Sequence, residues 1–343
     1  MSMSATAGTQ TMTAIVHDEY GTAPEHVLHL AQVDRPTVGD DELLVRVHAA
    51  SVDRGTWHVM TGLPYAIRAA GFGLRKPKHL NPGRSLAGTV VSVGARVTGF
   101  SPGDDVYGIC DGSFAPYVCV RPDKLAPKPV SLSYEEAAAV PVSALTALQA
   151  VRDHGRVQTG EKVLIVGASG GVGTFAVQIA KAFGAEVTGV CSTGKVDVVR
   201  SLGADHVIDY TLEDIGVGGQ RYDVILDIGG NRSLAQLRRA LTPRGRLVIV
   251  GGETDGRWLG GADRQIRAIV LSLFVGQKLG TLLCSENAND LAVLTELIDA
   301  GKVAPVIDRT YPLSDVSTAI RCMQDGHARG KLVINLTAPP DRS

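Results

Sequence analysis

The chain has 343 residues, enough for about two domains. Hydrophobic residues make up 44% of it and charged residues 20%, which is typical of a globular protein and not of a disordered chain. The 34 Lys and Arg residues balance 35 Asp and Glu residues, so the net charge of −1 gives no support for a nucleic acid or a membrane surface as a partner.

The five cysteines are scattered and form no Cys-x-x-Cys pair, which is typical of free thiols in a reducing compartment. Residues 1–12 are polar, without a basic start or an apolar run, and predict a flexible tail and no signal peptide. No segment reaches the roughly 18 apolar residues that a membrane span needs. We therefore expect a cytoplasmic protein.

Residues 13–135 predict short strands separated by turns. The stretches 42–51 and 87–94 carry β-branched residues between Gly, Pro and Asp. Residues 99–109 hold a Pro-Gly turn that leads into a further strand. Many short strands separated by such turn residues indicate a compact, barrel-like β domain.

The pattern changes at Ser133, which has capping-box spacing to Glu136 and predicts a helix start. Pro141 interrupts this helix, and a second one is expected over 143–155. From Glu161 onward, strands alternate with helices, which predicts βαβ units around a parallel sheet.

The C-terminal part continues with a helix expected near 289–301 and a strand over 331–336. This last strand either closes the parallel sheet or returns to the first domain.

A glycine-rich turn lies in VLIVGASGGVGTF, residues 163–175, between a strand and an amphipathic helix. Its glycines permit a tight turn and admit a ligand without a Cβ in the way. The helix start directs N–H groups and its positive dipole end toward this gap, which suits a pyrophosphate. The pattern is Ala168-x-Gly170-x-x-Gly173, so an alanine, tolerable at negative φ, replaces the first glycine of the dinucleotide fingerprint. Within a strand–helix–strand unit it predicts a dinucleotide site.

The end of the second strand indicates which dinucleotide binds. An NAD site has an Asp or Glu there for the ribose 2′-hydroxyl. This chain has Cys191 followed by Ser192, Thr193 and Lys195, which offer hydrogen bonds or charge to a 2′-phosphate. The same residues also suit a solvated, capped helix start. NADPH is favoured over NADH.

Five stretches carry a family resemblance: PGRSLAGTVVSVGARVTGFSPGDDVYG, AAAVPVSALTALQAV, GEKVLIVGASGGVGTFAVQIAKAFGAEV, SLGADHVIDY and GKLVINL. Together they resemble the medium-chain dehydrogenase/reductase superfamily, and most closely its zinc-independent quinone oxidoreductase branch. The resemblance implies an α/β protein with a GroES-like β-barrel domain, residues 13–135 and 305–343. Residues 136–304 would form a Rossmann domain, a doubly wound parallel sheet.

In this family the active site is the cleft between the two domains. The resemblance implies that Ser192, Lys195 and Tyr210 hold the 2′-phosphate and that Thr146 lies near the nicotinamide. The expected cofactor residues are Thr146, Ser169, Gly170, Gly171, Val172, Gly173, Ser192, Thr193, Lys195, Tyr210, Gly251 and Gly252.

The resemblance also predicts that no zinc is bound. Zinc alcohol dehydrogenases of the superfamily have a cysteine at the position of Asp53, a His–Glu pair at Arg84 and Ser85, and a further cysteine near Val142. Without a strong Lewis acid to ionise an alcohol, hydride transfer to an electron-poor quinone or enone is favoured. The protein then positions the acceptor and stabilises the oxyanion that develops.

Three residues are candidates for catalysis: Asp53, Tyr65 and Thr146. Asp53 stands where quinone oxidoreductases have asparagine, and an ionised carboxylate would repel an oxyanion. It therefore titrates high, pairs with Arg54 or Arg84, or faces away from the substrate. Tyr65 resembles a cleft tyrosine of the family, and a packed loop aromatic explains it equally well.

Other functions stay open. One is an alcohol dehydrogenase or aldehyde reductase of the same fold, and another is an NADPH-binding sensor or scaffold without turnover. The resemblance implies a homodimer formed by strand pairing across the Rossmann sheets. The apolar stretch 268–276 fits such an edge, or equally a buried strand and helix of one subunit.

Overall fold

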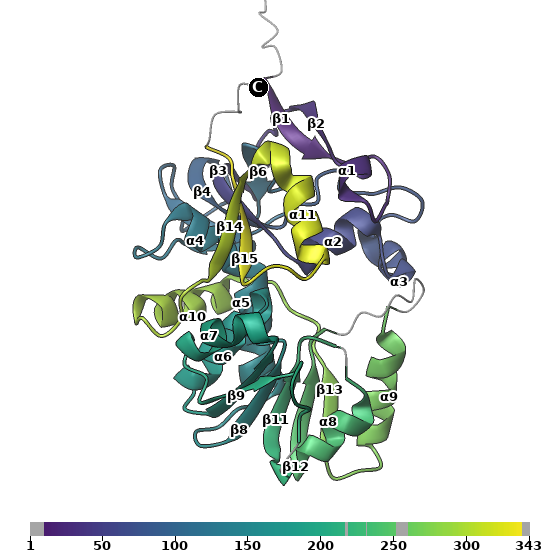
Figure 1. The fold of residues 1–343 in the computed structure, drawn as a ribbon. Helices are drawn as coiled ribbons and strands as arrows, with labels where there is room; N and C mark the ends of the chain where they lie inside the picture. The colour runs from purple at the N-terminus through teal and green to yellow at the C-terminus, as the bar shows by residue number, and fades with distance from the viewer. Residues whose placement is uncertain (1–9, 217–218, 231, 252–259, 338–343) are drawn as a thin grey trace, which may run out of the picture.

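The computed structural model describes residues 10–216, 219–230, 232–251 and 260–337. In Figure 1 a β-rich domain lies above a parallel sheet flanked by helices. No helix in these ranges is long and apolar enough to cross a bilayer.

The β-rich domain is built on a seven-stranded sheet in the order β14-β15-β3-β4-β5-β7, with β6 pairing on β3. Its strands are β3 (Leu43–Val52), β4 (Ser85–Val93), β5 (Asp105–Ile109), β6 (Tyr117–Val120), β7 (Leu125–Pro127), β14 (Ile307–Pro312) and β15 (Lys331–Asn335). A separate antiparallel pair joins β1 (Thr11–Val16) to β2 (His29–Asp34). Since β15 pairs with β3, the C-terminal strand returns to the first domain.

The second sheet is parallel and six-stranded, in the order β10-β9-β8-β11-β12-β13. Its strands are β8 (Lys162–Val166), β9 (Glu186–Cys191), β10 (His206–Asp209), β11 (Tyr222–Asp227), β12 (Leu241–Ile249) and β13 (Lys278–Thr281). The chain winds outward in opposite directions from the β8–β11 pair, and ligands of open α/β sheets bind at such a switch point. The predicted doubly wound sheet is confirmed.

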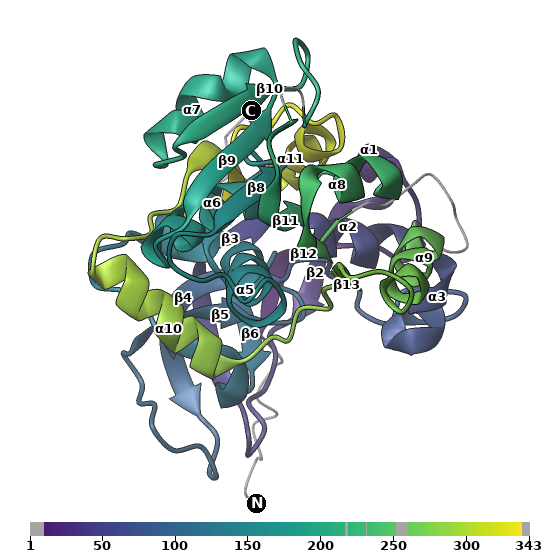
Figure 2. The ribbon, with the colours of Figure 1, turned by 90° about the horizontal axis from the view of Figure 1, so that it is seen from below.

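The predicted helices are present with shifted boundaries, whereas the helices at 24–27, 54–61, 65–67 and 316–324 were not predicted (Figures 1 and 2). They are α1 (Pro24–Val27), α2 (Arg54–Thr61), α3 (Tyr65–Ile67), α4 (Tyr134–Ala139), α5 (Pro141–Gln149), α6 (Gly171–Ala182), α7 (Val196–Ser201), α8 (Leu234–Ala240), α9 (Ala262–Ser272), α10 (Ala288–Asp299) and α11 (Val316–Gln324).

Local sequence explains how α4 and α5 begin. The Ser133 hydroxyl accepts the Glu136 N–H at 3.1 Å, and the Glu136 carboxylate accepts the Ser133 N–H at 2.8 Å, so the predicted capping box is present. Pro141 is the first residue of α5, a position where its missing N–H leaves no hydrogen bond unmade. The second helix therefore starts at this proline.

The apolar stretch 268–276 is not a strand. Residues 268–272 belong to α9, and the edge strand of the parallel sheet is β13, which follows this stretch. A run of apolar residues alone does not distinguish a strand from one face of a helix.

The largest hydrophobic core joins the two domains. Leu145 and Leu148 of α5 are fully buried in it with Phe175 of α6, and the same cluster includes Tyr107 of β5. The Tyr107 hydroxyl also donates to the Leu291 carbonyl of α10 at 2.7 Å. The domains are therefore held together by packed side chains, with α5 and α10 between them (Figure 1).

Candidate functional site

The glycine-rich turn joins β8 to α6 at the carboxyl edge of the parallel sheet. A Cβ on Gly173 would lie 2.1 Å from the Gly167 carbonyl oxygen, so only glycine lets α6 approach the end of β8 this closely. The positive φ of the turn, 87°, falls on Gly167. Ala168 is absent from the described residues with positive φ, as an alanine there requires.

The start of α6 forms a cradle for an anion. Gly170 is its N-cap, and no side chain caps the helix. The N–H groups of Gly171, Val172 and Gly173 have no acceptor within the helix, because the first turn of any α-helix leaves them unpaired. A Cβ on Gly170 would meet only the Gly167 oxygen, at 3.5 Å. With Ser169 in the same turn, the predicted residues form one site whose donors fit a cofactor diphosphate.

The end of β9 carries the residues predicted for the 2′-phosphate. Ser192 and Lys195 are half-buried there, while the Tyr210 side chain, beyond β10, is 56% exposed. Lys195 Nζ donates to the carbonyls of Gly326 and Ala328, at 3.0 and 2.8 Å, and so ties this edge to the β-rich domain.

Arg329 is a further cation at this edge that sequence reasoning missed. Its Nη2 lies 3.9 Å from the point that a Cβ on Gly194 would occupy, and Gly194 lies between Thr193 and Lys195. Arg329 comes to this edge because β15 returns to the first domain, so no local sequence pattern predicts its position here.

A carboxylate also lies at this edge. Asp209, the last residue of β10, accepts the Thr211 hydroxyl at 2.7 Å. Hydrogen bonds from Thr193 and Thr211 hold the pKa of the Asp209 carboxyl below its ordinary value. The dinucleotide pattern predicts an acidic residue only at the end of β9, where none stands, so it gave no sign of Asp209.

Thr146 lies on α5, where its hydroxyl donates to the Val142 carbonyl at 2.7 Å. Burial raises the pKa of the neighbouring Cys284 thiol to about 11, although a hydrogen bond with Thr146 acts to lower it.

Gly251 follows β12, and a Cβ there would lie 2.2 Å from the Ile228 oxygen. Gly252 lies outside the described residues.

A buried ion pair at the carboxyl end of β11 was not predicted. Asp227 is fully buried and pairs with Arg264 of α9. Its Oδ1 also accepts the Gly230 N–H at 3.2 Å. This pair anchors α9 beside the edge of the sheet where the cofactor residues gather.

Asp53 is the N-cap of α2 and is 6% exposed. Its Oδ1 accepts the Thr56 N–H at 3.0 Å, and its Oδ2 accepts the Ser85 hydroxyl at 3.2 Å. Pairing with Arg54 or Arg84 is one of three alternatives for Asp53, and no ion pair within 4 Å joins it to either arginine, although its charge helps to raise the pKa of Arg84. Arg54 lies 5.3 Å from the centre of the Trp57 ring, whereas Arg84 pairs with other carboxylates.

Arg84 lies between the domains. Its guanidinium contacts Asp111 and Glu286, each at 2.6 Å. Burial disfavours the charge of Arg84, but Glu286 and Asp111 outweigh that cost and raise its pKa. Because Ser85 bonds to Asp53, the positions that carry zinc ligands in related dehydrogenases lie together here. Across the described ranges, no group of three His, Cys, Asp or Glu side chains has a metal-binding arrangement.

Tyr65 begins the short helix α3. The Arg68 guanidinium lies between two aromatic rings, 4.6 Å from the centre of Tyr65 and 4.2 Å from that of Tyr20. A Cβ on Gly260, before α9, would lie 2.8 Å from Pro64. Figures 1 and 2 both place α3 close to α9, so Tyr65 lies where the two domains approach.

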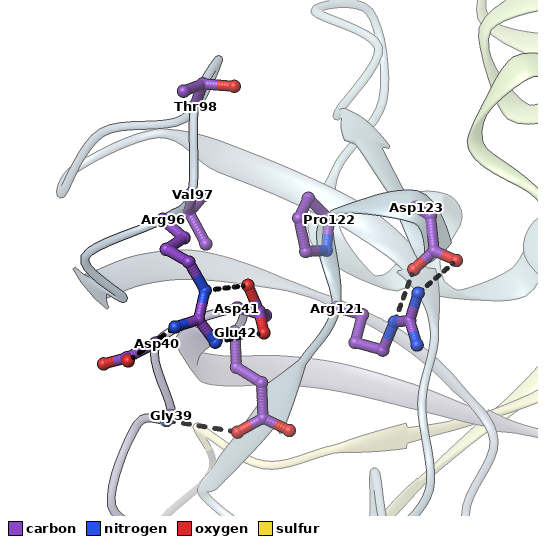
Figure 3. Close-up of a pocket in the computed structure, with 10 residues that line it drawn as sticks. All are labelled: Gly39, Asp40, Asp41, Glu42, Arg96, Val97, Thr98, Arg121, Pro122 and Asp123. Carbon is purple, nitrogen blue, oxygen red and sulfur yellow. Dashed lines mark hydrogen bonds and ion pairs between the residues drawn. The ribbon is translucent and has the colours of Figure 1, made fainter.

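A surface hollow of about 610 Å³ lies in the β-rich domain, and Figure 3 draws the residues that line it. It is lined by residues 39–42, 96–98 and 121–123, and carries exposed ion pairs of Arg96 with Asp40 and Asp41 and of Arg121 with Asp123. None of the predicted site residues lines it. We therefore place the candidate active site between the two domains, at the residues described above, and not in this hollow.

A parallel sheet with a glycine-rich turn, packed on a β domain that the C-terminus completes, defines a two-domain dinucleotide-dependent oxidoreductase. Two family models match the chain: the alcohol dehydrogenase GroES-like domain over residues 39–130, and the zinc-binding dehydrogenase family over residues 202–334.

Individual relatives agree with these matches. The mouse mitochondrial NAD(P)H oxidoreductase RTN4IP1 is 35% identical, over 95% of this chain and 89% of its own. The tomato (Solanum lycopersicum) 2-methylene-furan-3-one reductase is 32% identical over 94% and 79%. The structure of a Coxiella burnetii quinone oxidoreductase superposes with a TM-score of 0.83 at 30% identity, covering 95% of this chain and all of that one.

The chain belongs to the medium-chain dehydrogenase/reductase superfamily, in its quinone oxidoreductase-like branch. It is an NAD(P)H-dependent oxidoreductase. The predicted family and fold class are confirmed.

Proposed function

We propose that this protein is an NADPH-dependent, zinc-independent reductase of quinones or enones. The observation that carries the cofactor choice is the end of β9, where Ser192, Thr193 and Lys195 stand in place of an acidic residue and Arg329 lies close by. Two cations and hydroxyl donors suit a 2′-phosphate dianion.

Two groups at this edge act against a phosphate. Asp209 carries a negative charge, and Lys195 Nζ already donates two hydrogen bonds to the carbonyls of Gly326 and Ala328. An ammonium group has three donors, so Lys195 retains one for a phosphate. With Arg329 added, the cations at this edge outnumber the carboxylate.

The chemistry that NADPH supplies when bound is transfer of a hydride to the acceptor, which gains two electrons and takes a proton from water. The amides at the start of α6 hold the diphosphate. The Cys284 thiol, with its pKa raised to about 11, stays protonated at neutral pH and serves as no nucleophile.

Zinc independence rests on the residues at the family's ligand positions. Arg84 and Ser85 stand where a His–Glu pair would bind the metal, and a guanidinium repels a dication. Quinone or enone reduction needs no Lewis acid to ionise an alcohol. A quinone and a conjugated methylene ketone are also the acceptor types in the names of the Coxiella and tomato relatives.

The test is NADPH oxidation, followed at 340 nm, by metal-analysed protein with a quinone, an enone and an aldehyde. We expect quinone or enone turnover with far less than one zinc per chain. We also expect kcat/KM to be at least about tenfold higher with NADPH than with NADH. Zinc-dependent aldehyde turnover would instead support an alcohol dehydrogenase, and NADPH binding without turnover a sensor or scaffold.

We further propose a homodimer formed at the open edge of the parallel sheet. β13 is the outermost strand there, and α9 beside it exposes large apolar side chains. These are Ile266, Ile269 and Val270, followed by Leu273 and Phe274, which are 78% and 79% exposed. A contiguous apolar surface next to a sheet edge favours a second copy of the chain. A cytoplasmic location stays a prediction.

A further inference from the structure

Lys331, the first residue of β15, is only 2% exposed. A lysine is almost never buried this deeply unless a partner compensates its charge. Burial lowers the pKa of Lys331, and the charge of Asp53 acts against that shift. Neither the fold nor the proposed hydride transfer accounts for this ammonium group.

The Lys331 side chain touches three parts of the candidate site. Its Nζ donates to the Val52 carbonyl and to the Ser143 hydroxyl, each at 3.1 Å. Its Cδ lies 3.2 Å from the point that a Cβ on Gly171 would occupy. The acceptor side, helix α5 and the cofactor turn therefore meet at one lysine.

Asp53 is the negatively charged group that acts on Lys331. It follows Val52 directly and is buried, yet no ion pair within 4 Å joins it to a cation of the described chain. Its carboxylate accepts hydrogen bonds only from the Thr56 N–H and the Ser85 hydroxyl, both neutral donors. A buried carboxylate so placed needs positive charge nearby. The charge of Asp53 helps to raise the pKa of Arg84, but Asp111 and Glu286 already hold that guanidinium. Lys331 is the other cation, because it donates to the carbonyl of Val52, the residue before Asp53.

We propose that Lys331 is a positioning residue that compensates the charge of Asp53, so that an oxyanion can form beside this carboxylate. This inference rests on the proposed function. An uncompensated Asp53 would repel the negative charge that develops on the acceptor during hydride transfer. With the Lys331 ammonium close to it, the pair is neutral as a unit, and Asp53 no longer opposes the negative charge on the acceptor. Arg84 does not take this part, because Asp111 and Glu286 already share its guanidinium.

The test is a double-mutant cycle of the full-length protein: wild type, Lys331→Gln, Asp53→Asn and the double variant. Glutamine keeps an N–H donor for the Val52 carbonyl but loses the charge, and Lys331→Met removes both. Lys302→Gln is the matched control, because it removes one exposed lysine charge away from the site. For each variant we would measure kcat at saturating NADPH, the NADPH dissociation constant by fluorescence, and urea unfolding.

We expect Lys331→Gln to lower kcat by about 30-fold or more and Asp53→Asn to lower it less. Adding Asp53→Asn to Lys331→Gln should raise kcat by at least about tenfold, because the uncompensated carboxylate is gone. Lys302→Gln should match wild type. A lysine that only fills space cannot give this recovery, since the second substitution restores no packing.

Other results would overturn the proposal. Additive losses in kcat would mean that the two charges do not act as a pair. Weaker NADPH binding by Lys331→Gln without recovery in the double variant would assign the lysine to the diphosphate. If wild type turns over no acceptor, the proposed function fails. The charge pair is then tested by the unfolding free energies of the four proteins. Additive losses of unfolding free energy in the double variant would reject the pair, and a smaller loss in the double variant than in Lys331→Gln would support it.

Discussion

Arg84 of the GroES-like domain and Glu286, which precedes α10 of the Rossmann domain, form an ion pair at 2.6 Å that joins the two domains at the candidate active site. Their side chains are 17% and 28% exposed, so water screens the pair only in part. The same guanidinium binds Asp111, at 2.6 Å, on the other side. One arginine therefore joins a carboxylate of each domain.

Replacing Arg84 by methionine should cost about 2–4 kcal/mol of unfolding free energy, because Asp111 and Glu286 then lose their shared cation. Activity should fall as well, since the ion pair that holds the two domains together at the candidate site is lost. Glu286→Gln, which leaves the Arg84–Asp111 pair intact, should cost about 1 kcal/mol or less. Urea unfolding and steady-state rates measure both effects. Equal losses from the two variants would contradict a role for the arginine as the shared centre.

Two glycines of the turn should respond differently to alanine. Gly173→Ala should destabilise the protein by about 3 kcal/mol or more, because its Cβ would lie 2.1 Å from the Gly167 oxygen. Gly170→Ala should fold normally, because its φ of −84° suits alanine and the nearest atom is 3.5 Å away. It should nevertheless bind NADPH more weakly, since the methyl group faces the phosphate cradle. Thermal unfolding and fluorescence titration separate the two cases.

Arg329→Ala should weaken NADPH binding by about 10-fold or more and leave NADH binding nearly unchanged, as expected for a charged hydrogen bond to the 2′-phosphate. The matched control is Arg200→Ala, which removes an exposed arginine on α7. Isothermal titration with both cofactors measures the difference. An equal loss for NADH and NADPH would place Arg329 elsewhere than at the 2′-phosphate.

The proposed dimer should separate when charge is placed on its apolar surface. Leu273→Glu and Phe274→Glu alter side chains that are 78% and 79% exposed, so the fold of one subunit should tolerate them. Light scattering after size-exclusion chromatography should show a dimer for wild type and a monomer for the variants. A monomeric wild type, or variants that stay dimeric, would reject this interface.

Cys284 should react slowly with iodoacetamide. Burial raises the pKa of its thiol to about 11, and the thiolate is the reactive form. At pH 8 only about 0.1% of such a thiol is ionised, and the rate should rise about tenfold per pH unit up to pH 10. Mass spectrometry of the alkylated peptide follows it, with urea-unfolded protein as the reference. Full labelling of folded protein at pH 8 would show that the thiol is not protected.

Local sequence patterns correctly predicted the features that depend only on residues close together in the chain. The capping box of Ser133 and Glu136 depends on residues three apart, and the start of α6 depends on glycines within one turn. Both were predicted correctly. The stretch 268–276 was harder, because an apolar run is compatible with a strand or with a helix face, and neighbouring elements decide between them.

The residues adjacent to Asp53 in the sequence do not predict which side chains surround it. Arg54 is adjacent in sequence, but its guanidinium lies over Trp57. The carboxylate instead meets Ser85 and comes under the influence of Lys331, which is more than 270 residues away. Such contacts follow from the pairing of β15 with β3.

The sequence by itself determined the family, the parallel sheet with its glycine-rich turn and the residues offered to a cofactor. Each of these depends on spacing along the chain, which sets helix periodicity, turn geometry and the direction of N–H groups. Only the tertiary structure decided that Arg329 and Lys195 share one edge, that Arg84 bridges the domains and that Lys331 donates to the carbonyl of Val52, next to Asp53. Charges act through space, and the return of the C-terminus to the first domain determines which of them become neighbours.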